Sequence, residues 1–149
     1  MLACSERHIR DVFAMLKRQK EKPLLTGGLE ARLLKQWHVD LIRDARVRRM
    51  YFAYDTADDY EPLAAAGKLL YDNGITRTSH RCSCYVLIGY PGDTFEAAEK
   101  RLRAAWAAGF MPYAMLYRDN AGIADKHWCR FQSDWLLPRL VMRKLREVI

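Results

Sequence analysis

The residues of this sequence that are best suited to binding a ligand lie at the ends of four stretches that we expect to be extended. Carboxylate and guanidinium groups recognise hydroxyl and carboxylate groups, while tyrosine rings and glycine backbone offer a flat surface to a ring. Together they favour a nucleoside-like ligand, with hydroxyl groups for Asp55 and a flat base against Ile88 and Gly89. The candidate binding residues are Glu30, Arg32, Tyr54, Asp55, Ile88, Gly89, Tyr90, Tyr117 and Arg118.

Several of these residues also have a purely structural interpretation. Glu30 and Arg32 lie two positions apart, so on an extended chain they share a face and can neutralise each other. Asp55 can cap the helix that follows it, and Gly89 can serve close packing alone. A phosphate site at Gly89-Tyr-Pro-Gly is disfavoured, because Asp93 at the start of the next helix would repel an anion.

The cysteines, Cys4, Cys82, Cys84 and Cys129, form neither a disulfide framework nor a metal motif. Cys82 and Cys84 share one strand face, but only His80 is close to them in sequence, and a zinc site needs about four ligands. We interpret the pair as small core residues and predict no metal site. So few scattered cysteines are typical of a reducing compartment, which predicts a cytoplasmic protein.

Alternating helical and extended patterns must position the candidate residues. Strands that alternate with amphipathic helices predict an α/β fold with about four parallel strands. In such folds ligands bind at the carboxyl ends of the strands, where the candidate residues lie. The predicted strands are residues 24–29, 50–54, 84–88 and 111–117.

The predicted helices carry recognisable start and stop signals. Ser5 is the expected cap of the first helix, and Asn73-Gly74 is the expected stop of the third. Asp93 and Glu96 have the spacing of a capping box before the fourth helix. Pro138 is expected to break a helical tail whose aromatic residues pack in the core.

The composition sets limits on the function. The chain has 149 residues with 25 Lys plus Arg and 18 Asp plus Glu, a formal net charge of +7, which is typical of one globular domain. No apolar run approaches the ~20 residues of a membrane-spanning helix, so no membrane partner is expected. The positive charge leaves nucleic acid open as an alternative partner. The basic groups that motivate it are Arg43, Arg46, Arg48 and Arg49, and Arg139, Arg143, Lys144 and Arg146.

Three of the strand-end stretches resemble segments of radical S-adenosylmethionine enzyme domains. Gly-Gly-Leu-Glu-Ala-Arg-Leu-Leu at 27–34 is similar to their third-strand segment, and Tyr-Phe-Ala-Tyr-Asp-Thr at 51–56 to their fourth strand with its ribose-binding end. Tyr-Val-Leu-Ile-Gly-Tyr-Pro-Gly-Asp-Thr at 85–94 is similar to their adenine-contacting fifth strand and the turn after it. The similarity covers about residues 1–120, and residues 121–149 are expected to form a helical C-terminal extension that packs on this part.

The resemblance implies an incomplete TIM-like barrel that binds S-adenosylmethionine across its open top, beside a [4Fe-4S] cluster. In such enzymes the reduced cluster cleaves the cofactor to a radical that abstracts hydrogen from a substrate. Asp55 would hold the ribose hydroxyls, Ile88 and Gly89 would cover the adenine, and Glu30 and Arg32 would meet the methionine part. The same segments and the fourth predicted strand add Tyr54, Tyr90, Tyr117 and Arg118.

The sequence departs from this family at the cluster motif. The Cys-x-x-x-Cys-x-x-Cys that holds the cluster is missing, and Tyr85 and Asp93 replace an expected Gly and Glu. We therefore expect this chain to be the later part of such a domain, from which the amino-terminal part with the cluster motif is missing. Such a chain would hold no cluster and would be catalytically silent by itself. The alternative is an assembly or nucleic-acid-binding module that reuses half a barrel. In either case the open sheet edge is expected to promote self-association.

Overall fold

The computed structural model describes residues 1–75, 79–120, 122 and 125–146. Residues 121, 123, 124 and 147–149 of the predicted C-terminal extension lie outside the described residues. The elements along the chain are α1 (Glu6–Lys17), β1 (Leu24–Leu29), η1 (Ala31–Leu33), α2 (Gln36–Asp44), β2 (Arg49–Tyr54), η2 (Ala57–Asp59), α3 (Tyr60–Asp72), β3 (Cys82–Ile88), α4 (Phe95–Ala107), β4 (Met111–Leu116), α5 (Lys126–Asp134) and α6 (Pro138–Arg146).

The four strands form one parallel sheet in which each strand pairs with the next one along the chain, in the order β1-β2-β3-β4. Phe52 of β2 lies opposite Cys84 of β3, and Tyr85 of β3 lies opposite Tyr113 of β4. This confirms the predicted α/β class and the four parallel strands. The sheet is open: within the described ranges, β1 and β4 each have a single strand neighbour. Self-association through these edges stays a prediction.

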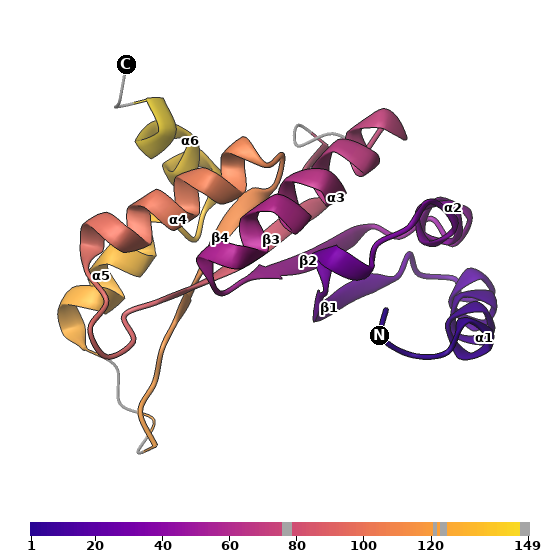
Figure 1. Ribbon diagram of the computed structural model, residues 1–149, viewed down its shortest axis with the longest axis horizontal. Coiled ribbons are helices and arrows are strands. Elements are labelled where there is room, and N and C mark those ends of the chain that lie inside the picture. The colour runs from indigo at the N-terminus through magenta and orange to yellow at the C-terminus, as the bar shows by residue number, and fades with distance from the viewer. Residues whose placement is uncertain (76–78, 121, 123–124, 147–149) are drawn as a thin grey trace.

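One face of the sheet carries the hydrophobic core. Met50, Phe52, Cys84, Val86 and Ile88 alternate along β2 and β3, and all of them are inaccessible to solvent. Helices α3 and α4 lie across the sheet on this side (Figure 1). The alternation explains the fold, because residues two apart on a strand point to the same face.

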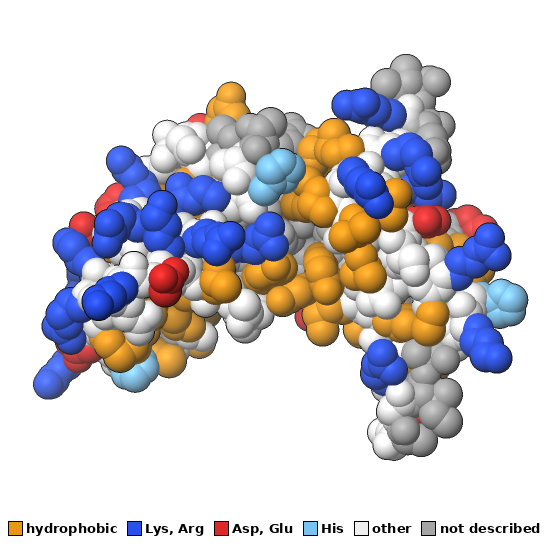
Figure 2. All heavy atoms as spheres, turned by 180° about the vertical axis from the view of Figure 1, so that it is seen from behind, with side chains coloured by type: hydrophobic (Ala, Val, Ile, Leu, Met, Phe, Trp, Pro, Cys, Tyr) orange, Lys and Arg blue, Asp and Glu red, His pale blue; other side chains and the backbone are white. Residues whose placement is uncertain are grey.

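The opposite face of the sheet is aromatic and remains partly exposed. Tyr51 stacks on Tyr85 with ring centroids 4.6 Å apart, and Tyr113 meets Tyr85 edge-on at 5.5 Å. The Tyr85 hydroxyl donates a hydrogen bond to the Thr26 carbonyl oxygen of β1 at 3.1 Å, and Met115 is 44% exposed. Figure 2, which views the molecule from behind, shows hydrophobic side chains exposed across its middle.

Most predicted element boundaries are confirmed. The Ser5 Oγ accepts a hydrogen bond from the His8 amide at 3.4 Å, as expected of a cap. Gly74 follows α3 with a φ of +76°, the left-handed conformation that ends a helix. Strand β3 begins at Cys82 rather than at residue 84, because Cys82 already pairs with Met50 of β2.

The C-terminal helices pack on the β4 side of the sheet. Pro138 is the first residue of α6, so the predicted break is confirmed. Trp135 is fully buried, and Phe131 stacks on Phe95 of α4 at 5.3 Å, as expected of core aromatics. Within the part of the chain that the structure describes, no helix combines the length and the apolar character that crossing a bilayer requires.

Candidate functional site

The carboxyl ends of β1 and β2 enclose a small polar cavity of about 140 Å³, here called the strand-end cavity. It brings together three of the predicted binding residues, Glu30, Arg32 and Asp55, from segments far apart in sequence. The parallel strands explain this, since both chains leave the sheet at the same rim. The lining residues are Gly28, Leu29, Glu30, Ala31, Arg32, Ala53, Asp55, Asp59 and Pro62.

Two carboxylates hold the guanidinium of Arg32 in the strand-end cavity. Its Nε lies 3.0 Å from Glu30 Oε1, which confirms that this pair can neutralise itself, and its Nη2 lies 2.6 Å from Asp59 Oδ1. Burial opposes ionisation of Asp59, but hydrogen bonds from Thr56 and Arg32 outweigh it and lower the pKa of Asp59. The two anions therefore fix the orientation of the Arg32 guanidinium and of its remaining N–H donors.

Asp55 is the one carboxylate lining the strand-end cavity that has no hydrogen bond or ion pair with any described residue. Burial and, secondarily, the charge of Asp59 raise its pKa. Asp55 does not cap the following helix; Asp59 instead accepts hydrogen bonds from the Thr56 amide and hydroxyl. A carboxylate without a partner is an acceptor that a ligand hydroxyl can satisfy.

A second and larger cavity of about 680 Å³ opens on the other side of Asp55, between α3 and α4. We call it the tyrosine cavity. Tyr54 is only 5% exposed, burial raises its pKa, and its ring centroid lies 6.3 Å from that of Tyr60. The small side chains Ala97 and Ala104 leave the space on the α4 side. The lining residues are Tyr54, Asp55, Thr56, Tyr60, Tyr90, Ala97, Lys100, Arg101 and Ala104.

A buried ion pair fixes the turn between β3 and α4. The Asp93 side chain is fully inaccessible; it accepts hydrogen bonds from the Gly89 amide at 2.8 Å and from Arg101 Nη2 at 2.7 Å. The predicted capping box of Asp93 and Glu96 is wrong, because Thr94 caps α4 by accepting from the Ala97 amide. Paired with Arg101, Asp93 therefore has a structural role that its spacing in the sequence does not reveal.

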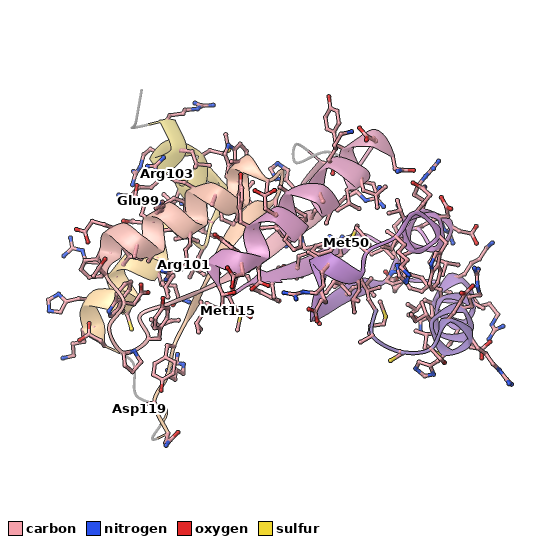
Figure 3. All side chains as sticks on the ribbon, in the orientation of Figure 1. Met50, Glu99, Arg101, Arg103, Met115 and Asp119 are labelled. Carbon is pink, nitrogen blue, oxygen red and sulfur yellow. The ribbon has the colours of Figure 1, made fainter. Side chains whose placement is uncertain are left out.

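Arg101 also lines the tyrosine cavity. Its guanidinium lies 5.2 Å from the ring centroid of Tyr90 and donates to the Leu87 carbonyl oxygen at 3.0 Å. Figure 3 shows that Arg101 projects from α4 away from the side that carries Glu99 and Arg103. Arg103 instead donates a hydrogen bond to the Lys144 carbonyl oxygen of α6 at 2.9 Å and pairs with Glu99.

The third predicted segment, residues 85–94, contributes less side-chain surface to the cavities than the sequence suggested. Ile88 is 0% exposed and shares the core face with Val86, so its side chain lines neither cavity. Gly89 has a φ of +73°, and a Cβ there would lie 2.9 Å from the Trp128 ring. The packing interpretation of Gly89 therefore accounts for this residue.

The end of the fourth predicted strand, which carries Tyr117 and Arg118, stays apart from both cavities. The Tyr117 amide donates to the Ile88 carbonyl oxygen at 2.9 Å, extending the pairing beyond β4. Arg118 Nη1 donates to the Gly122 carbonyl oxygen at 3.1 Å. Neither residue lines the strand-end or the tyrosine cavity.

Of the residues that line the two cavities, only Glu30, Arg32, Tyr54, Asp55 and Tyr90 were predicted as binding residues. The helical side contributes residues that the strand ends do not indicate, among them Asp59, Tyr60 and four residues of α4. The spacing of Ala97, Lys100, Arg101 and Ala104 is the i, i+3, i+4, i+7 pattern of one helix face, which could have identified them.

The cysteines do not fit an iron–sulfur cluster. Cys82 and Cys84 are buried, and burial raises the pKa of Cys82 to about 12 and that of Cys84 further. Within the described ranges, no three His, Cys, Asp or Glu side chains come together in a way that could hold a metal ion. Cluster ligation needs several thiolates, which two protonated core thiols do not supply.

Thiol reactivity tests this placement. At pH 8 in the folded protein, we expect iodoacetamide to modify the exposed Cys4 and Cys129 and to spare Cys82 and Cys84, which stay protonated below about pH 12. Unfolding in guanidinium chloride should make all four react. Mass spectrometry of tryptic peptides measures each site, and rapid native modification of Cys82 would contradict the core assignment.

No protein-family model matches this sequence, and neither the curated proteins nor the solved structures give a match. The function is therefore inferred from the geometry of the site.

Proposed function

We propose that this chain binds S-adenosylmethionine at the carboxyl ends of β1 and β2, as the cofactor-binding part of a radical S-adenosylmethionine enzyme domain. The observation that carries the proposal is the position of Asp55. It is an unpartnered carboxylate between a small charged cavity and a larger aromatic one. The cofactor has the matching order of groups, because its ribose diol lies between a charged amino-acid end and a flat base.

Each cavity suits one end of the cofactor. Glu30 and the paired Arg32 in the strand-end cavity offer an acceptor and donors to the ammonium and carboxylate of the methionine part. The tyrosine cavity, at about 680 Å³, lies within the ~300–1,000 Å³ usual for ligand pockets and surrounds a flat ring with Tyr54, Tyr60 and Tyr90. In this proposal the base lies beside the tyrosines and not against the buried Ile88.

The order of the strands supports the same proposal. A parallel sheet that runs β1-β2-β3-β4 without reversal is the arrangement of an arc of a βα barrel, and it has no topological switch point. In an arc, the face that carries Tyr51, Tyr85 and Tyr113, opposite α3 and α4, corresponds to the barrel interior, whereas the tyrosine cavity lies on the helix side of the rim. The finer assignment to an incomplete TIM-like barrel is part of this proposal.

The proposal assigns no radical step to these residues. The cysteines do not fit a cluster, so this chain contributes cofactor binding and orientation, and no catalytic residue is assigned.

Replacing Asp55 with asparagine tests the proposal. The loss of an anionic acceptor for the ribose diol should weaken S-adenosylmethionine binding about 10- to 100-fold, measured by isothermal titration calorimetry. Affinity for the wild-type chain should also fall as the pH is lowered through the raised pKa of Asp55, because the protonated acid accepts poorly.

The matched control is Asp58→Asn, which removes an exposed carboxylate from the neighbouring η2 turn and lines neither cavity. It should bind as the wild-type chain does. Equal affinities for all three proteins would show that Asp55 does not hold the ligand.

A further inference from the structure

A third hollow, which we call the basic hollow, lies at the opposite end of the sheet from Asp55. It has a volume of about 440 Å³, and five of its six lining residues are cations. They precede the amino ends of three parallel strands, so the topology gathers them. The lining residues are Lys22, Arg43, Arg46, Val47, Arg48 and Arg81.

The cations of the basic hollow have no anionic partner among the described residues. Arg81 Nη2 donates to the Val47 carbonyl oxygen at 2.9 Å, and none of the five forms an ion pair with another described residue. Asp44, beside Arg43 in sequence, is instead paired with Lys17 at 2.7 Å. Figure 2 shows Lys and Arg side chains gathered over the end of the molecule formed by α1 and α2.

Such an arrangement favours a compact anion of high charge. Five like charges around one hollow repel one another, and a multiply charged anion relieves that repulsion. Arginine is suited to phosphate oxygens, since its planar guanidinium donates two parallel hydrogen bonds. The lining contains no aromatic ring, so the hollow lacks the stacking surface that single-stranded nucleic acids use.

We infer that the basic hollow binds a short chain of linked phosphates, either inorganic triphosphate or the triphosphate group of a nucleotide. The site is independent of the proposed S-adenosylmethionine site, because the two lie at opposite ends of the strands and share no residue.

Calorimetric titration of the full chain with sodium triphosphate, ATP and orthophosphate at low salt tests this inference. Triphosphate should bind in a 1:1 ratio and at least about tenfold more tightly than orthophosphate, and its affinity should fall as salt is raised. Comparable binding of ATP indicates that the nucleotide's phosphates are the ligand, whereas triphosphate alone indicates the inorganic ion. Triphosphate should also raise the melting temperature.

The variant Arg43→Gln/Arg48→Gln should lose at least about tenfold in triphosphate affinity. Its control, Arg130→Gln/Arg139→Gln, removes the same charge from exposed positions on α5 and α6 and should bind as the wild type does. Equal losses in both variants would show attraction to the whole basic protein and overturn the inference. So would binding of a ten-nucleotide RNA without binding of triphosphate, which would indicate a nucleic-acid surface.

Discussion

Replacing Gly67 with alanine is expected to lower the free energy of unfolding by about 3 kcal/mol. Gly67 lies in α3 where this helix meets the segment after α4. A Cβ built at Gly67 would overlap the carbonyl oxygen of Ala108 and lie 3.1 Å from the ring of Phe110. The obstacle is backbone, which cannot rotate away, so α3 must move from α4 and disturb the tyrosine cavity between them. Urea unfolding followed by circular dichroism measures the change.

The matched control is Gly27→Ala in β1. A Cβ at Gly27 meets nothing within 4 Å, and the residue has no positive φ. Its effect should stay below about 1 kcal/mol, within the range of ordinary exposed substitutions. If both variants unfold at the same urea concentration, the close approach of α3 to Ala108 is wrong.

Replacing Arg101 with methionine is expected to lower the free energy of unfolding by about 3 kcal/mol. The side chains of Asp93 and Arg101 are 0% and 14% exposed, so the substitution leaves a buried carboxylate without its counter-charge. The two amide hydrogen bonds from Gly89 and Thr94 remain but do not neutralise it. Thermal unfolding at pH 7 should show a clearly lower midpoint.

Lys68→Met provides the comparison. It breaks an ion pair with Asp72 on the surface of α3, in which the lysine is 75% exposed, and such pairs contribute less than about 1 kcal/mol. Similar losses from both variants would mean that Asp93 gains solvent or another partner when Arg101 is removed. The double variant Asp93→Asn/Arg101→Met should recover part of the stability, since it removes both charges.

The strands were predictable because their apolar runs are short and their alternation is strong. Phe52, Val86 and Ile88 mark one buried face, and the polar residues after each strand mark the rim. The same alternation shows why Ile88 cannot present its side chain to a ligand. Ile88 lies two residues after Val86 on the same strand, so its side chain points to the same core face. Applied residue by residue, the period of two would have removed Ile88 from the site.

The contributions of the helices were not predictable from strand ends. Tyr60, Lys100 and Arg101 reach the tyrosine cavity only because α3 and α4 pack at a particular separation, which depends on contacts such as that of Gly67. The buried role of Asp93 likewise depends on Arg101, two helical turns away in α4. Helical spacing groups Lys100 and Arg101 on one face of α4, but it does not indicate which part of the sheet or of α3 that face meets.

The most direct test of S-adenosylmethionine binding is a calorimetric titration of the wild-type chain with the cofactor at neutral pH. We predict saturable binding in a 1:1 ratio, with methionine alone binding far more weakly because it lacks the ribose diol and the base. The Glu30→Gln variant should weaken binding of the complete cofactor and leave adenosine binding unchanged. Absence of saturable binding up to about 1 mM, or equal affinity for S-adenosylmethionine and methionine, would contradict the proposed function.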